Sequence, residues 1–275
     1  MKSISGAGKL LLSYAIGAFA LQACSSDDAP LPTTVKKWDA LTLSAKNEVP
    51  APAGRTEDGM VTLELLSNNT LKYDIMLHSL KAGDALTAAH IHPGNAGQNG
   101  GVLINFNPTF NGLVASGTVT GLRQGQIDSL LNTPVYVNVH STQVPGGLVR
   151  AQLDHNVVFA YDGALSGANE NPAVTTTATG AAVLRLTDDK TLYSLVTVTG
   201  IETNDTITVS HIHRGATGTN GPVRIFLANN KDEFGVPRSS VLVDSLYNIL
   251  IGTDPIYVNA HSKLHGGGIV RGQIR

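Results

Sequence analysis

The second half of this 275-residue chain repeats the first half, and this repeat limits the fold more than any other feature of the sequence. The segment 90–92, His-Ile-His, recurs 121 residues later as 211–213, and the pattern Gly-x-x-Gly-x-Asn-Gly begins two residues after each copy. The segment 134–141, Pro-Val-Tyr-Val-Asn-Val-His-Ser, recurs at the same distance as 255–262. Because a fixed period of this kind indicates a duplicated structural unit, the sequence predicts two copies of one domain.

Each copy has the pattern of β-structure. Short runs rich in Val, Thr and Ile are separated by Gly, Pro, Asn or Asp, and long amphipathic helical patterns are scarce. A unit of about 115 to 120 residues has the size of a single β-sandwich. We therefore expect an all-β chain with β-sandwich domains at 37–155 and 156–275. A third repeated segment, Asn-Glu-Val-Pro at 47–50, recurs as Asn-Glu-Asn-Pro at 169–172, one residue out of register.

The start of the chain has the features of an exported protein. Two lysines precede an apolar stretch at 10–21, which is short for a membrane-spanning helix but suits the core of a signal peptide. The stretch leads into Leu-Gln-Ala-Cys at 21–24, which resembles a bacterial lipobox, and Cys24 is the only cysteine of the chain. The alternative is an ordinary cleaved signal followed by a chance cysteine.

These features predict a signal peptide at 1–23, a lipidated Cys24 and a polar, flexible tether at 24–36. Acyl chains on the cysteine would hold the protein at a membrane. The acidic pair at 27–28 resembles an export tag of surface-exposed bacterial lipoproteins. The expected localisation is therefore extracytoplasmic, as an outer-membrane lipoprotein that faces either the periplasm or the cell exterior, with the membrane as one partner.

Charge and motifs exclude several classes of protein. The formal net charge is −2 and no run of Lys or Arg is present, so nucleic acid is not an expected partner. The sequence also contains no Gly-x-Ser-x-Gly nucleophile motif and no phosphate-binding glycine loop. Whether the chain is an enzyme stays open, and the lack of a catalytic motif favours a noncatalytic role.

The repeated histidines lie opposite an apolar strand face. Alternate residues of a β-strand share a face, so His90 and His92 project from one side, as do the two histidines of 211–213. In 135–140 the three valines form one apolar face, and in 256–261 Ile, Val and Ala do the same. The residues on the opposite face are Tyr136, Asn138 and His140 in the first copy, and Tyr257, Asn259 and His261 in the second.

A turn after this strand places an arginine near the histidines. The glycines at 146–147 predict an antiparallel hairpin, and alternation puts Arg150 on the same side as His140. The second copy repeats this arrangement with Arg271, across the glycines at 266–268.

Three converging imidazoles suggest a metal site in each domain. Imidazole ligands suit zinc and copper, and three of them leave a coordination position open. Histidines scattered on a solvent-facing surface are the alternative interpretation, and the tyrosines and asparagines are either residues that orient the rings or polar cover on a sheet face. The predicted ligands are His90, His92, His140, His211, His213 and His261, and the predicted supporting residues are Tyr136, Asn138, Arg150, Tyr257, Asn259 and Arg271.

The composite pattern of each copy resembles the CHRD domain, which is named from chordin and occurs in many bacterial proteins. The second copy keeps the usual Arg-Gly-Gln at 271–273, whereas the first has Arg-Ala-Gln at 150–152. The resemblance covers about Trp38 to Arg271. It implies an extracellular Greek-key β-sandwich without a catalytic activity, of a kind that accompanies growth-factor-binding modules in chordin.

A looser similarity is to copper/zinc superoxide dismutase, whose immunoglobulin-like barrel also carries a His-x-His strand. By this likeness His90, His92 and His140 are copper ligands, and Arg150 and Arg271 guide an anion. No histidine lies between 92 and 140, so the bridging imidazole and the zinc cluster of that enzyme have no counterparts.

Three hypotheses follow. The first is a noncatalytic extracytoplasmic binding module whose partner is an unidentified protein or ligand, with zinc or copper as the expected cofactor. The second is a copper-dependent metalloenzyme like superoxide dismutase. The third is a lipoprotein whose function is to scavenge metal.

Overall fold

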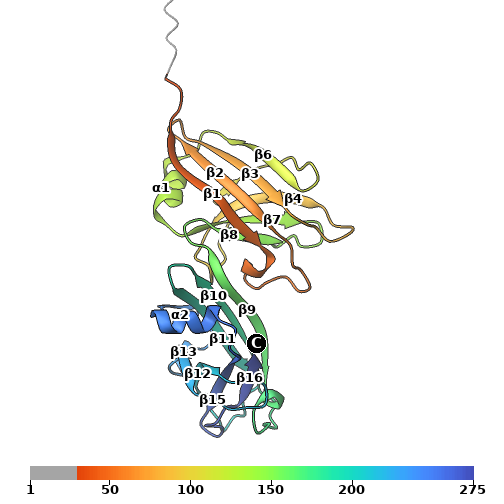
Figure 1. Cartoon of the computed structure of the whole chain (residues 1–275), viewed down its shortest axis with the longest axis vertical. Helices are drawn as coiled ribbons and strands as arrows, with labels where there is room; N and C mark the ends of the chain where they lie inside the picture. The colour runs from red at the N-terminus through yellow and green to blue at the C-terminus, as the bar shows by residue number, and fades with distance from the viewer. Residues whose placement is uncertain (1–29) are drawn as a thin grey trace, which may run out of the picture. The chain divides into compact units, whose positions relative to one another are not determined.

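A computed structural model describes residues 30–275 of the chain. They form two consecutive all-β domains, each with a single eight-stranded antiparallel sheet and one short α-helix (Figure 1). The predicted signal peptide at 1–23, Cys24 and the first part of the tether lie outside the described residues. No helix within 30–275 has the length and apolar character needed to span a membrane.

The first domain contains β1 (Thr34–Ser44), β2 (Asp58–Leu66), β3 (Thr70–Leu77), β4 (Leu86–Pro93), β5 (Ile104–Asn105), β6 (Val114–Val119), α1 (Gln124–Asn132), β7 (Val135–Ser141) and β8 (Val149–Gln152), with a 3-10 turn η1 (Ala45–Asn47). The second contains β9 (Val157–Ser166), β10 (Thr179–Thr187), β11 (Thr191–Thr199), β12 (Ile207–Arg214), β13 (Val223–Ala228), β14 (Arg238–Val241), α2 (Asp244–Ile251), β15 (Ile256–Ser262) and β16 (Val270–Gln273), with 3-10 turns η2 (Gly167–Asn169) and η3 (Lys231–Glu233).

The strands follow the same order in both domains. It is β5-β4-β7-β8-β1-β2-β3-β6 in the first and β13-β12-β15-β16-β9-β10-β11-β14 in the second. In each sheet the fourth and fifth strands are paired at one position only, Ser44 with Arg150 and Ser166 with Arg271. Each sheet therefore consists of two four-stranded halves joined at a single point.

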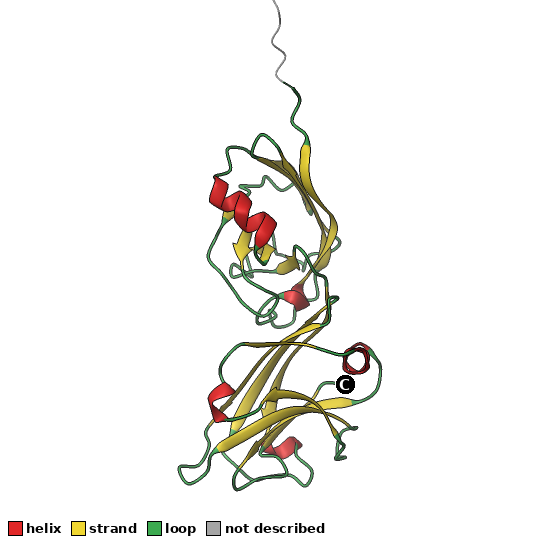
Figure 2. Cartoon of the chain, turned by 90° about the vertical axis from the view of Figure 1, so that its left-hand side faces the viewer, coloured by secondary structure: helices red, strands yellow, loops and turns green. Residues whose placement is uncertain are grey.

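The two halves of each sheet enclose one hydrophobic core. Buried and accessible residues alternate along β2 and β3, because one face of these strands turns inward and the other faces solvent. Val61 and Ile75 from this half pack in the same cluster as Ile91 and Val137 from the other half. The second domain has a separate core of its own. Figure 2 shows the strands of each domain curving around its interior.

The strand that carries the third histidine is buried on both faces. Every residue of β7 is buried, and so is every residue of β15 except His261, which is half-buried. The valines of β7 face the core as expected from their alternation. The opposite face does not form an open outer wall, because the loops at 93–101, 144–147 and 47–50 cover it, as the contacts described below show.

The sequence predictions of an all-β chain, two tandem domains and an antiparallel hairpin of β7 with β8 are confirmed. The boundaries 37–155 and 156–275 stay predictions, and so does the finer assignment to a Greek-key sandwich of the immunoglobulin or superoxide dismutase type. The described strands show one folded sheet in each domain rather than two separate sheets.

Candidate metal centre

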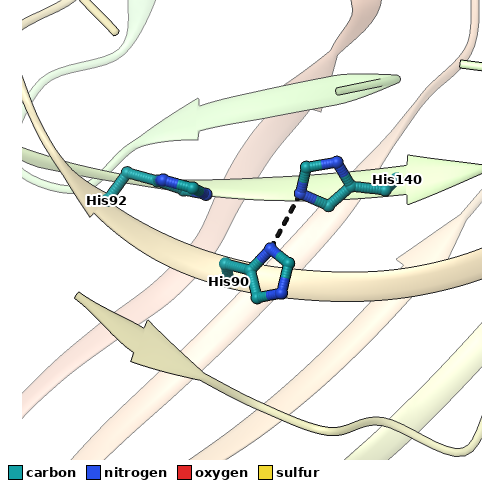
Figure 3. A group of neighbouring side chains, drawn as sticks. All are labelled: His90, His92 and His140. Carbon is teal, nitrogen blue, oxygen red and sulfur yellow. Dashed lines mark hydrogen bonds between the residues drawn. The ribbon is translucent and has the colours of Figure 1, made fainter. Parts of the chain in front are cut away.

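The first domain brings its three predicted histidine ligands together. His90 and His92 lie on β4, and the adjacent strand β7 carries His140, with His90 opposite Asn138 in the register. Each ring offers one nitrogen to a group in which all three atoms lie within 4.8 Å of one another. Figure 3 shows the three rings gathered on neighbouring strands, with a hydrogen bond of 2.9 Å between His90 Nδ1 and His140 Nε2.

Backbone carbonyls fix which nitrogen of each ring carries a proton. His92 Nδ1 donates to Gly100 O at 3.0 Å, and His140 Nδ1 donates to Pro145 O at 2.9 Å. In the neutral tautomer the Nε2 atoms of both rings are then free of protons. His90 Nδ1 donates to His140 Nε2 in this arrangement, whereas His92 Nε2 is buried and has no hydrogen-bond partner.

The second domain repeats this geometry. His211 Nδ1 lies 3.2 Å from His261 Nε2, and His213 Nδ1 donates to Gly221 O at 2.8 Å. His261 Nδ1 donates to Gly266 O at 3.0 Å, and His213 Nε2 is buried without a partner, like its counterpart in the first domain. The two domains therefore orient all six imidazoles in the same way.

Burial keeps the histidines neutral. Desolvation, followed by the neighbouring histidines, lowers the pKa of His90 to about 4, and the same causes lower the pKa of His211 to about 4. Desolvation is also the main cause that lowers the pKa of the other four rings, those of His92, His140, His213 and His261. Neutral imidazole is the form that ligates a metal, so the cluster is prepared for a cation at neutral pH.

The tyrosines and arginines lie behind the histidines. Tyr136 stacks on His92 with ring centroids 5.2 Å apart, and its hydroxyl accepts a hydrogen bond from the Gly100 amide. The guanidinium of Arg150 lies 3.4 Å from the centre of the Tyr136 ring. In the second domain Tyr257 stacks on its histidine at 4.9 Å and holds its arginine at 3.4 Å.

Arg150 is buried and its donors are occupied. They reach Asn95 O and Gln98 O in the loop after β4, and also the side chains of Asn99 and Gln152. Arg271 makes the equivalent contacts with the backbone in the second domain. Both arginines thus anchor the glycine-rich loop, and a role in guiding anions stays a prediction.

Glu48 and Glu170 are two candidate functional residues to which the sequence assigned no role. Asn138 Nδ2 donates to both carboxylate oxygens of Glu48 at 2.8 and 2.9 Å. Glu170 is the equivalent of Glu48 and is also buried. Both glutamates come from the repeated Asn-Glu-x-Pro segment, which was the available signal. Gly147 is constrained by this contact, because its φ is +136° and an added Cβ would lie 2.5 Å from Asn138 Nδ2.

The two clusters differ at one neighbouring position. Asn105 pairs with His90 in the strand register, whereas Phe226 pairs with His211. The Phe226 ring packs edge-on against His211 with centroids 4.5 Å apart. His265, a loop residue of the second domain, is not part of the three-histidine group.

The fold and the site define a class of protein: a tandem pair of β-sheet domains, each with three histidines on two adjacent strands. The chain belongs to the CHRD domain family, because residues 40–153 and 161–274 each match the CHRD domain. Comparisons with curated proteins and with solved structures found no match.

Proposed function

We propose that the chain is a membrane-anchored extracytoplasmic binding module in which each CHRD domain holds one zinc or copper ion. The observation that carries this proposal is the convergence of three histidine nitrogens within 4.8 Å, in the same orientation, in both domains. The buried and unpartnered Nε2 atoms of His92 and His213 support it, since a buried acceptor without a partner is costly unless a ligand uses it.

The donor set fits these two metals. The hydrogen bonds of the rings assign His92 Nε2 and His140 Nε2 as acceptors in the first domain, and His90 Nδ1 would join them when its proton moves to Nε2. Nitrogens bound to a tetrahedral zinc lie about 3.3 Å apart, given zinc–nitrogen bonds of about 2.0 to 2.1 Å. His90 Nδ1 and His140 Nε2 lie 2.9 Å apart, all three nitrogens lie within 4.8 Å, and the carbonyls of Gly100 and Pro145 support the rings from behind.

Metal analysis tests the proposal. The purified chain, stripped with a chelator and reloaded with zinc or with copper, is expected to retain two ions per chain by elemental analysis. H90A should retain one ion, and H90A combined with H211A should retain none. H78Q is the matched control, because His78 is an exposed histidine that contacts Asp58 and lies outside the clusters. A chain that binds no metal, or a double variant that keeps both ions, contradicts the proposal.

A metalloenzyme is the second candidate, and the three-ligand set favours it because catalytic metal sites keep one position open. Superoxide turnover by the copper-loaded chain, lost in the double histidine variant, would establish this role instead. Two bound ions without turnover would leave binding or scavenging of the metal as the function.

Anchoring through Cys24 is a separate part of the proposal, supported by the lipobox-like segment at 21–24. The chain expressed with its leader is expected in the membrane fraction, with acyl chains on Cys24 detected by mass spectrometry. C24S should move it to the soluble fraction. An unacylated Cys24 would contradict this part and leave the metal proposal unaffected.

A further inference from the structure

Each domain contains a second repeated feature, a cavity lined by the buried glutamate of the Asn-Glu-x-Pro segment. The first cavity has a volume of about 320 Å³ and is lined by Glu48, Asn138 and the Gly146–Gly147 turn, among other residues. The second has a volume of about 290 Å³ and is lined by Glu170 and the glycines at 266–268. The cavities are therefore built from equivalent parts of the two domains.

The first cavity presents hydrogen-bond acceptors without enough donors. Glu48 is 5 % exposed, and its carboxylate accepts only from Asn138 Nδ2. Asn138 is 4 % exposed, and its own Oδ1 has no partner. In the second domain Glu170 Oε1 and Asn259 Oδ1 are also buried without partners. Both domains thus leave the asparagine Oδ1 free, and the second also leaves one glutamate oxygen free, which is costly unless a ligand donates to these atoms.

No cationic side chain neutralises these glutamates directly. In the described part of the chain neither Glu48 nor Glu170 forms a salt bridge. The guanidinium of Arg150, which influences Glu48 electrostatically, donates to the loop carbonyls and to Asn99 and Gln152 instead. A buried carboxylate in this situation favours a bound cation.

The other walls of the cavities carry both apolar and polar side chains. The apolar ones are Val49, Pro50, Pro52 and Val144 in the first cavity, and Pro172, Val174 and Leu264 in the second. The polar ones are His92, Asn99 and Tyr136 in the first cavity, and Asn171, Asn220 and His265 in the second. Both volumes are about ten times the roughly 30 Å³ that one water occupies in the liquid, and they fall near the lower end of small-molecule sites. Free acceptors and aliphatic side chains in one cavity suit a cation that carries a short hydrocarbon chain.

We propose that the Glu48 cavity and the Glu170 cavity each bind a small alkylammonium group, whose N–H donors meet the carboxylate and, in the first domain, Asn138 Oδ1. The cation satisfies the free acceptors and compensates the buried charge, while its alkyl part contacts the proline and valine walls. His92 of the histidine cluster also lines the first cavity, but the proposed ammonium contacts are those of the glutamate and the asparagine and do not depend on a metal.

Nuclear magnetic resonance titration tests the proposal site by site. The probe is propylammonium chloride, added to the ¹⁵N-labelled full chain in an amine-free buffer with a chelator present. The amides of Gly147 and Gly268, which lie beside the two glutamates, are expected to shift and saturate at roughly millimolar probe. E48Q should weaken the response at Gly147 at least tenfold and leave that at Gly268 intact, and E170Q should do the reverse. E64Q, at a half-buried carboxylate paired with Lys72 outside both cavities, should change neither response.

A blocking variant keeps the test independent of the carboxylate. Gly146 lines the first cavity, an added Cβ meets no atom within 4 Å, and its φ lies outside the left-handed region. G146L should therefore abolish the Gly147 response with Glu48 still present. Three results overturn the proposal: no response to the probe, an unchanged response in E48Q and G146L, or an equal response to potassium chloride. Because the chelator removes metal, each of these results is separate from failure of the metal proposal.

Discussion

Burial acts on the acids and the bases of each domain in the same direction, towards the neutral form. Desolvation raises the pKa of Glu48 to about 7, against the opposing effects of Arg150, Asn138 and Arg185, and it lowers the pKa of His90 to about 4. Protein interiors disfavour charge of either sign. Raising the pH ionises the buried Glu48 and should lower the stability of the fold. Lowering the pH protonates the histidines and should weaken metal binding.

The stability of the chain should depend on the pH through Glu48. The unfolded carboxyl loses its proton near pH 4.5 and the folded one near pH 7, so the folded state loses stability as the pH rises through this window. At 1.36 kcal/mol per pH unit, the loss is roughly 2 to 3 kcal/mol between pH 5 and pH 8. Because glutamine carries no charge, E48Q should gain this amount relative to wild type at pH 8 but not at pH 5.

Urea unfolding of both proteins in amine-free buffer at the two pH values measures this difference. E64Q is the control, since Glu64 is paired with Lys72 and its pKa is lowered rather than raised. A difference between E48Q and wild type that is the same at pH 5 and pH 8 would contradict the burial argument.

The metal affinity should respond weakly to mild acid. An unperturbed histidine with a pKa near 6.5 is mostly protonated at pH 6, so an ordinary three-histidine site loses much of its affinity there. Since the pKa of His90 lies near 4, and those of His92 and His140 are also lowered, the rings stay neutral. We expect zinc affinity to fall by less than about tenfold between pH 8 and pH 6. Competition with a chromophoric chelator measures it, and a fall of about 100-fold would show that the rings titrate normally.

The clustered histidines could be predicted from the sequence, whereas Glu48 could not be given a role. Strand alternation is a local rule, so the spacing of His90 and His92 already defines their common face. The contact between Glu48 and Asn138 joins residues 90 positions apart through loops, and no local pattern specifies it. The repeat of Asn-Glu-x-Pro marked the segment as important but not its partner.

At the level of elements, the arginine of β8 connects the hairpin to the glycine-rich loop after β4. Arg150 donates to Asn95 O and Gln98 O, and the same loop supplies Gly100 O, which orients His92. The loop therefore positions a ligand, and the arginine positions the loop.

The variant R150K tests this connection. Lysine keeps the charge but lacks the planar fork that serves several acceptors and stacks on Tyr136. We expect a loss of roughly 2 to 4 kcal/mol in the free energy of unfolding, and a fall in zinc affinity of about 10 to 100-fold for the first site. R123K, at an exposed arginine, should change either quantity little. An unchanged affinity in R150K, despite lower stability, would confine the arginine to a structural role.

Part of the element arrangement follows from sequence and part does not. The turn at 146–147 and the alternation of β7 and β8 predict their pairing, which is short-range. The burial of both faces of β7 depends on loops that fold back from distant parts of the chain, such as the one at 47–50. The single joint between the sheet halves, at Ser44 and Arg150, likewise rests on long-range pairing.

At the scale of the whole molecule, duplication has produced two clusters that are similar but not equivalent. His211 is buried, whereas His90 is half-buried, and the residue beside the ring is Phe226 in one case and Asn105 in the other. An aromatic ring against a ligand restricts the access of water and of competing ligands. The two sites should therefore exchange metal at different rates although their ligand sets are the same.

We expect the zinc-loaded chain to release its two ions to excess chelator in two phases, with the slower phase from the second domain. F226N should accelerate that phase towards the rate of the first site, and N105F should slow the first site, because each substitution exchanges the cover over one ring. Stopped-flow measurement with a chromophoric chelator follows both phases, and H90A assigns them by removing the first. V223A, at an exposed residue of the same strand as Phe226, is the control. A single phase in wild type, or rates that F226N leaves unchanged, would mean that the ligands alone set the exchange and that the two domains act as equal copies.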